Sequence, residues 1–350
     1  MKTIMYELWS EDANTKAEKV LLELRCFSIL DIELSGQCNF NCCYCDSPDR
    51  NKPYDVPMDK IKSILLSGKI KYVFICGLGE PTAVGQNYNT LVELLRICKE
   101  VGIQCSMFTN LYYLTDALLE YIKSGTLNIL FKLDSFDPTE VVNIYGIPLS
   151  MAEAQIENIK RVTKLVREQN GLVNIGASIV PTRLNYKGIL SIIKKCLELG
   201  IYPLLTDLED SGSATAEYSD LSLNPEELNN LKLMIGAMLG KEYNPPVCPS
   251  VISGVHINHR GKVTVDARSG LSCGWFWANE PIPYLIGDIH TESFQDICDR
   301  ILKFREEKLS SFAKAVSMKS SCDNQVFGGC GGNIKLLLER YKRLHKGGVL

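Results

Sequence analysis

Residues 28–48 read SILDIELSGQCNFNCCYCDSP, an apolar strand-like run followed at once by a cysteine-rich loop. Within this loop Cys38, Cys42 and Cys45 have the spacing C-x3-C-x2-C. Three thiolates on one tight loop can ligate three irons of a cubane iron–sulfur cluster and leave the fourth iron open to another ligand. A zinc site, or a loop whose cysteines have no metal role, is the alternative that spacing alone leaves open.

The rest of the first 240 residues predicts an α/β fold. Strand-like runs rich in β-branched and apolar residues alternate there with amphipathic helical patterns, as in successive β-α units around a parallel sheet. We predict strands at 28–35, 72–76, 104–109, 128–133, 173–180 and 202–206, and helices at 58–67, 88–101, 116–123, 151–169, 186–199 and 225–239. This order indicates a partial (β/α)6 barrel, in which functional groups gather at the carboxyl ends of the strands.

The pattern changes after the stretch Asn244-Pro245-Pro246. We therefore expect three parts: an N-terminal extension (1–30), the barrel (31–240) and a small α+β domain (241–350). The last part is predicted to contain hairpin strands at 255–258 and 262–266 and helices at 293–307 and 335–345.

The charge balance, the apolar runs and the cysteine content limit the functions that we expect. The 38 Lys and Arg residues nearly balance the 41 Asp and Glu residues, so no basic surface suited to nucleic acid is expected. No apolar run approaches the length of a membrane span, and the N-terminus does not resemble a signal peptide, so we expect a cytoplasmic protein without membrane contact. In a reducing compartment the 14 cysteines favour metal ligation over disulfides where they are clustered.

With an aromatic residue, Tyr44, before its third cysteine, the cysteine loop resembles the signature of the radical S-adenosylmethionine (SAM) superfamily. The stretch CGLGEP at 76–81 follows the second predicted strand and resembles the GGE motif of that family. The resemblance implies a [4Fe–4S] cluster whose open iron chelates SAM, with Tyr44 beside the adenine. It also implies that Gly77, Gly79 and Glu80 receive the SAM amino group.

Two further groups of residues are assigned by the same resemblance. Asp134 and Ser135 directly follow the fourth predicted strand, where the family contacts the SAM ribose or carboxylate. The C-terminal part resembles the SPASM or Twitch extension, which implies one auxiliary [4Fe–4S] cluster, with zinc as the alternative. Asp266 stands where the family has a cysteine, so the nearest set of loop cysteines is taken as the ligands: Cys248, Cys273, Cys322 and Cys330.

The resemblance implies an enzyme that cleaves SAM to a 5′-deoxyadenosyl radical and abstracts hydrogen from a C–H bond. A flavodoxin or ferredoxin is the expected external reductant. Because only about 30 residues precede the first strand, we favour a small biosynthetic substrate, similar to a sugar or aminocyclitol, and an oxidation assisted by the auxiliary cluster. Candidate catalytic residues and substrate contacts follow the fifth and sixth predicted strands: Arg183, Asp207, Glu209 and Asp210.

Two other functions remain open from the sequence. One is a maturase that cross-links or epimerises a ribosomally made peptide. The other, from a different class, is a non-enzymatic iron–sulfur or zinc scaffold, although such a protein has no need of a SAM site.

Overall fold

The structure of the 350-residue chain is a computed structural model. It describes residues 29–34, 36–45, 57–77, 79–83, 86–169, 175–208, 212–216, 218–240, 254–264 and 285–303.

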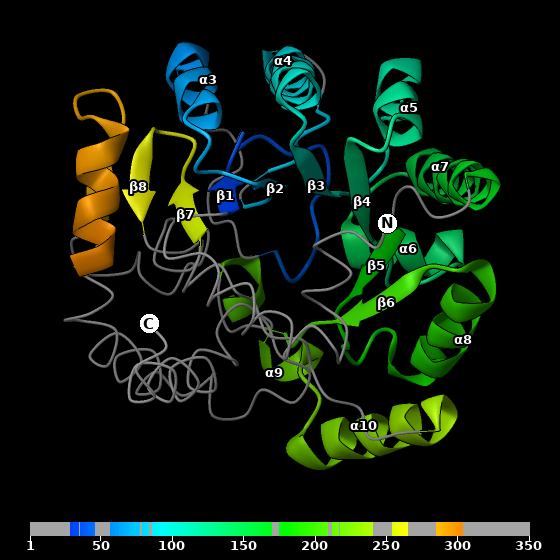
Figure 1. Cartoon of the computed structure of the whole chain (residues 1–350). Helices are drawn as coiled ribbons and strands as arrows, with labels where there is room; N and C mark the ends of the chain where they lie inside the picture. Colours follow the sequence, from blue (N-terminus) through cyan, green and yellow to red (C-terminus); the bar gives the residue numbers. More distant parts are fainter. Residues whose placement is uncertain are drawn as a thin grey trace.

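Strands and helices alternate in the predicted order (Figure 1). The strands are β1 (Ile29–Ile32), β2 (Tyr72–Ile75), β3 (Gln104–Thr109), β4 (Leu127–Lys132), β5 (Ile175–Ile179) and β6 (Tyr202–Leu205). The main helices are α3 (Met58–Leu66), α4 (Gln86–Val101), α5 (Asp116–Lys123), α6 (Pro138–Tyr145), α7 (Leu149–Glu168), α8 (Ile189–Leu199) and α10 (Pro225–Leu239). Short turns of helix lie at η1 (Tyr186–Gly188), η2 (Gly212–Ala216) and α9 (Tyr218–Leu221).

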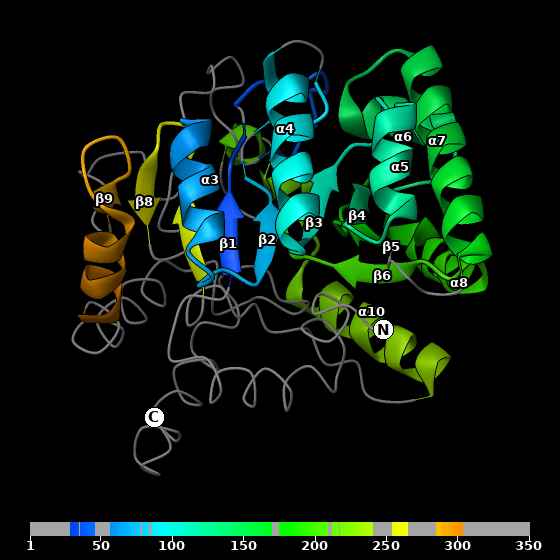
Figure 2. The same ribbon diagram turned by 45° about the horizontal axis from the view of Figure 1, so that its top comes forward.

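The strands β1 to β6 are parallel and lie side by side in sequence order. Helices α3, α4, α5, α7 and α8 cover the outer face of this curved sheet, whereas its inner face is turned toward the middle of the molecule (Figure 1 and Figure 2). The predicted partial barrel is therefore confirmed. In this arrangement the carboxyl ends of all six strands meet at one end of the barrel.

Three more strands continue the sheet on the other side of β1. Strand β7 (Gly254–Ile257) pairs in parallel with β1, and β8 (Lys262–Thr264) and β9 (Leu285–Asp288) follow in antiparallel pairing. The predicted hairpin is present, and residues 294–303 form a helix beyond it. The sequence did not predict that this hairpin pairs with β1. The domain boundaries stay a prediction, and the helix predicted at 335–345 lies outside the described residues.

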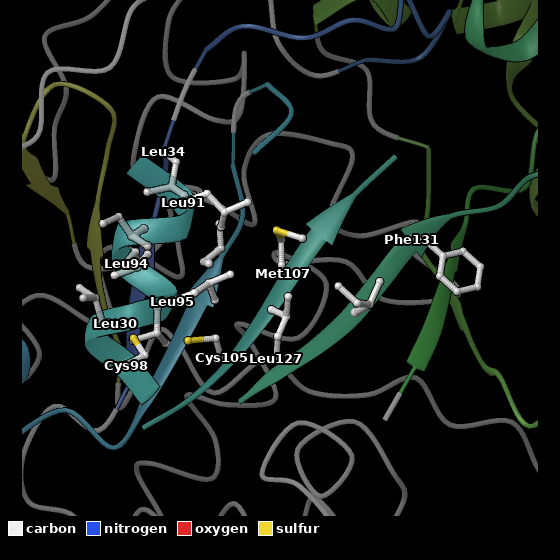
Figure 3. Packing of buried hydrophobic residues seen from close by; sticks show 14 of the residues in the cluster. Leu30, Leu34, Leu91, Leu94, Leu95, Cys98, Cys105, Met107, Leu127 and Phe131 are labelled. Atoms are coloured by element: carbon white, nitrogen blue, oxygen red, sulfur yellow. The ribbon is translucent and has the colours of Figure 1, made fainter. Parts of the chain in front are cut away.

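The main core lies between the sheet and its outer helices. Leu30 and Leu34, which flank Ile32 in β1 and its extension, point toward α4, where Leu91, Leu94 and Leu95 meet them (Figure 3). Each such fully buried leucine stabilises the fold by roughly 1.5–3 kcal/mol. Because side chains alternate along a strand, Asp31 and Glu33 face the other side, the interior of the barrel.

One helix beside the cysteine loop was not predicted. Helix α6 is capped at its N-terminus by Asp137, whose side chain accepts a hydrogen bond from the Thr139 N–H, and Pro138 is its first residue. It ends at Gly146, which adopts a left-handed conformation with φ of 57°. Aspartate, proline and glycine at these positions are ordinary helix start and stop signals. No helix within the described ranges is long and apolar enough to cross a membrane.

Candidate cofactor site

The cysteine loop follows β1 directly and is fixed to the end of α6. The N–H groups of Asn41 and Cys43 donate to the carbonyls of Tyr145 and Ile144, at 2.9 and 3.0 Å. A third backbone hydrogen bond, from Ser213 to the Cys45 carbonyl at 2.8 Å, holds the far end of the loop. The backbone of the loop is therefore held on two sides by hydrogen bonds within the protein.

Gly146 allows the loop to approach α6 this closely. A Cβ atom at position 146 would lie 2.7 Å from the backbone oxygen of Asn41. Both the space and the positive φ therefore favour glycine at the end of this helix.

Cys38, Cys42 and Cys45 are all partly exposed. Burial raises the pKa of Cys42 well above its usual value; the nearby Lys132 ammonium opposes this, while the thiols of Cys45 and Cys38 raise it further. The Phe40 N–H donates to the Cys38 Sγ at 3.5 Å. Three thiol ligands with an N–H···S bond and a nearby cation are a donor set that fits an iron–sulfur cluster.

Among the residues that the structure describes, no three His, Cys, Asp or Glu side chains converge closely enough to hold a single metal ion. A cubane cluster does not require such convergence, since each thiolate binds a different iron.

The loop after β2 contains Gly77, Gly79 and Glu80 and lies against the cysteine loop. The Glu80 N–H donates to the carbonyl of Gln37 at 2.7 Å, so the two loops are joined directly. Gly77 and Gly79 have φ of 109° and 76°, which L side chains rarely adopt. Gly77 is exposed at the surface, so a ligand can reach its backbone.

Glu80 itself is buried and strongly hydrogen-bonded. Its Oε1 accepts from the Thr82 N–H at 3.0 Å, the Thr82 hydroxyl at 2.7 Å and the Thr109 hydroxyl at 2.7 Å. Its Oε2 accepts from the Asn110 N–H at 2.6 Å. Burial raises the pKa of Glu80, and these hydrogen bonds oppose the rise. A carboxylate has about four lone-pair positions, so Oε2 can still accept from an ammonium group.

Tyr44 links the cysteine loop to the end of β4. Its hydroxyl donates to the Asp134 Oδ2, and the Lys132 Nζ lies 4.7 Å from the centre of its ring. The other carboxylate oxygen of Asp134 accepts from the Val180 N–H at 2.7 Å. Both oxygens of this fully buried side chain are thus engaged within the protein. Burial raises the pKa of Asp134, and Lys132 opposes that rise.

The other predicted site residues are more widely spread. Ser135 donates to the Glu140 Oε2 at 2.5 Å and accepts from the Asp137 N–H at 2.9 Å, at the start of α6. Arg183 is turned away to α10, where its Nη1 lies 3.3 Å from the Glu227 Oε1.

Asp207 is partly buried after β6. The remaining predicted residues lie outside the described part of the chain: Glu209, Asp210, Cys248, Cys273, Cys322 and Cys330.

The side chains at the ends of β1 and β7 were not among the predicted site residues. Glu33 lies between His256 and His259, and all three are fully buried. The signal for Glu33 was present: charged residues at 31 and 33 alternate with apolar ones in the run LDIEL. An acidic residue at an inward position of a barrel strand is unusual for a core and typical of a site.

Comparison with known proteins identifies the family. The profile of the radical SAM superfamily matches residues 32–207, half of the chain. The chain belongs to the radical SAM superfamily. The match begins at the last residue of β1 and contains β2 to β6 and both loops described above. Family membership implies a [4Fe–4S] cluster and SAM as cofactors of this radical SAM enzyme and disfavours a non-enzymatic scaffold.

Two characterised or provisionally described proteins are similar in sequence. A tungsten-containing aldehyde ferredoxin oxidoreductase cofactor-modifying protein from Pyrococcus furiosus is 25% identical over 210 residues, 58% of this chain and 54% of that protein. A protein from Methanocaldococcus jannaschii, provisionally described as a glycyl-radical enzyme activating enzyme, is 30% identical over 164 residues, 46% of this chain and 60% of that protein. The matched regions thus span between one half and two thirds of these relatives.

Solved structures share the fold at low sequence identity. SuiB from Streptococcus suis, bound to its precursor peptide SuiA, has a TM-score of 0.59 at 16% identity and covers 93% of this chain and 77% of its own. The structure of anSMEcpe with bound SAM and a peptide has a TM-score of 0.53 at 16% identity. The match covers 86% of this chain and 89% of the anSMEcpe chain. These likenesses confirm the radical SAM fold.

Proposed function

We propose that this radical SAM enzyme binds its cluster through Cys38, Cys42 and Cys45 and binds SAM between the cysteine loop, the loop after β2 and the end of β4. The observation that carries this proposal is the direct contact between the two loops, in which the Glu80 N–H donates to Gln37. That contact brings the exposed backbone of Gly77 and the partly exposed thiols to the same end of the barrel. When bound, the cofactors supply a 5′-deoxyadenosyl radical that can abstract hydrogen from a C–H bond.

Each side chain at this site has a defined task in the proposal. Glu80 accepts a charge-assisted hydrogen bond from the SAM ammonium through its Oε2. Lys132 provides a positive charge for the SAM carboxylate, and Tyr44 provides a ring beside the adenine. Asp134 acts mainly by holding Tyr44, because its own carboxylate oxygens are already engaged with Tyr44 and Val180. Ser135 supports the same end of β4 through α6.

The substrate lies in this proposal against the inner face of the sheet. Phe74 and Phe108 form a partly exposed aromatic pair there, with ring centres 5.3 Å apart. Asp207, after β6, is a partly exposed charged residue near the strand ends. This mixture of aromatic and charged groups suits a small polar molecule, such as a sugar or aminocyclitol. Asp207 remains a candidate contact, and Glu209 is proposed beside it.

Arg183 is a weaker candidate for substrate contact than the sequence suggested, because its guanidinium is paired with Glu227 on α10. Substrate oxidation would release an electron, and an auxiliary [4Fe–4S] cluster on Cys248, Cys273, Cys322 and Cys330 is proposed as its acceptor. A flavodoxin or ferredoxin is proposed as the reductant of the first cluster.

A peptide is the second candidate substrate. The structural match to SuiB covers 93% of this chain, and that SuiB structure contains its precursor peptide SuiA. A peptide substrate would make the enzyme a maturase that cross-links or epimerises its target.

Two measurements test this function. Reconstituted enzyme with SAM and dithionite is incubated with a panel of sugars and aminocyclitols, or with peptides encoded beside its gene. Faster formation of 5′-deoxyadenosine with one class of candidate substrate, together with a change in the mass of the added compound, identifies the substrate class.

The variant Glu80→Gln should weaken SAM binding while the iron content of the first cluster stays unchanged. Unchanged SAM affinity in this variant would contradict the assigned role of Glu80.

A further inference from the structure

Glu33 lies directly beneath the backbone of Gly77. A Cβ atom built at position 77 would be 2.2 Å from the Glu33 Cγ and 2.5 Å from its Oε1. Glu33 is fully buried, whereas Gly77 is exposed. The Glu33 side chain therefore lies against the backbone of an exposed glycine that a ligand can reach.

The β7–β8 hairpin holds Glu33 in this position. The His259 N–H donates to the Glu33 Oε2 at 3.3 Å, and the His259 Nδ1 lies 3.1 Å from the same oxygen. On the other side, the His256 Nε2 lies 3.6 Å from the Glu33 Oε1. Both histidines are fully buried. Contacts thus run without a gap from the hairpin through Glu33 to Gly77.

The charge of Glu33 is stabilised where it lies. Burial alone would raise the pKa of Glu33, but the nearby His256, the hydrogen bonds from His259 and the charges of both histidines outweigh burial and lower the pKa to about 2. The other titratable group on this inner face of β1 is Asp31, which is opposite His256 in the strand register. An ionised, hydrogen-bonded carboxylate has little freedom to rotate, so it provides a rigid support.

We propose that Glu33 is a positioning residue for SAM, which fixes the backbone of Gly77 and is itself fixed by His256 and His259. The proposal rests on the proposed role of the Gly77 loop in SAM binding. It implies that the β7–β8 hairpin contributes to SAM affinity through Glu33 rather than by contact with SAM. The geometry of a binding site depends on residues that support the ligand-contacting groups as well as on those groups themselves.

A double-mutant cycle between Glu33 and His259 tests this chain of contacts. The affinity for SAM is measured by calorimetry on anaerobically reconstituted holoenzyme, with iron content and melting temperature recorded for each variant. We expect Glu33→Ala to weaken SAM binding about 10-fold and His259→Ala to weaken it several-fold. The double variant should bind SAM as Glu33→Ala does, because His259 acts through Glu33. Independent, multiplying effects of the two changes would overturn the proposal.

A second cycle tests the contact with Gly77 itself. Gly77→Ala introduces both backbone strain and a clash with Glu33, whereas in the Glu33→Ala background only the strain remains. Gly77→Ala should therefore reduce the affinity for SAM by a smaller factor in the Glu33→Ala variant than in the wild-type protein. Asp31→Ala is the matched control, since it removes a buried carboxylate from the same face of β1, and its effect should add to that of Gly77→Ala.

A conservative change at Glu33 separates a loss of SAM positioning from a general loss of folding. Glu33→Gln keeps the side-chain volume under Gly77 and loses the charge, so it should weaken SAM binding less than Glu33→Ala but more than Asp31→Asn. SAM affinity equal to wild type in both Glu33 variants, with normal iron content, would refute the positioning role. Failure of the wild-type holoenzyme to bind SAM would instead refute the proposed function.

Discussion

The hydroxyl of Tyr44 in the cysteine loop donates a hydrogen bond to the Asp134 carboxylate at the end of β4. Tyr44 lies between two of the proposed iron ligands, and Asp134 is fully buried. This contact couples the position of the loop to the barrel, because Asp134 is also held by the Val180 N–H at 2.7 Å. A hydrogen bond to a buried charge is among the stronger polar contacts in a protein.

Tyr44→Phe should destabilise the fold and loosen the cysteine loop. Loss of a hydrogen bond to a charged group costs roughly 1.5–3 kcal/mol of unfolding free energy. Chemical denaturation measures this cost, and iron content after reconstitution measures the loosening. Tyr112→Phe is the matched control: its ring packs 6.5 Å from that of Phe40 in the same loop, and no hydrogen bond of its hydroxyl is found among the described residues. An equal effect of both changes would argue against the Tyr44 contact.

Gly146→Ala should disturb cluster assembly because the new methyl group would meet the backbone of Asn41 at 2.7 Å. Gly200→Ala provides the control, since Gly200 also ends a helix with positive φ, but a methyl group added there would have nothing within 4 Å. Strain alone should cost about 1 kcal/mol in either variant. Only Gly146→Ala should also lower the iron content, and equal iron content in both variants would show that the close approach is unimportant.

Much of this fold could be predicted from the sequence because the barrel strands are continuous apolar runs. The strands predicted at 72–76 and 104–109 agree with β2 and β3 to within one residue. Helix α6 was not predicted because it has only eight residues, too few for hydrophobic periodicity to give a clear signal. Its start and stop signals at Asp137, Pro138 and Gly146 were nevertheless present.

The site was only partly predictable. Local motifs mark the cysteine loop and CGLGEP, because their function depends on spacing within a few residues. Glu33 and His259 are 226 residues apart, and nothing local indicates that β7 pairs with β1. The pairing of Arg183 with Glu227 on α10 likewise depends on tertiary packing. Long-range contacts of this kind carry no periodic signal in a single sequence.

Glu33 should give the protein a characteristic sensitivity to acid. Its pKa is lowered from 4.5 to about 2 in the folded chain, so its ionisation stabilises the fold above pH 4.5 and this contribution is lost as the pH falls toward 2. The contribution is on the order of 3 kcal/mol at its full value. The difference in unfolding free energy between wild type and Glu33→Gln should therefore shrink between pH 5 and pH 2. A difference that stays constant or grows in this range would contradict the assigned ionisation.

The proposed auxiliary cluster can be separated from the first cluster by mutation. Wild-type protein reconstituted without oxygen should hold about eight irons if both sites are [4Fe–4S] clusters. A variant with Cys322→Ala and Cys330→Ala should lose roughly half of them and still cleave SAM, because the first cluster lies on the barrel loop. Substrate oxidation should fail in this variant. Zinc in the wild-type C-terminal part would instead favour a redox-neutral reaction such as epimerisation.

Reductive cleavage of SAM by the reconstituted enzyme tests the central claim most directly. With dithionite as reductant, the wild-type protein should convert SAM to 5′-deoxyadenosine and methionine, detected by chromatography and mass spectrometry. Single changes of Cys38, Cys42 or Cys45 to Ala should abolish this product, because each removes a thiolate on which the cluster depends. Cys43→Ala, in the same loop, should retain it. Normal formation of 5′-deoxyadenosine by any of the first three variants would contradict the assignment of these cysteines as the ligands of the SAM-binding cluster.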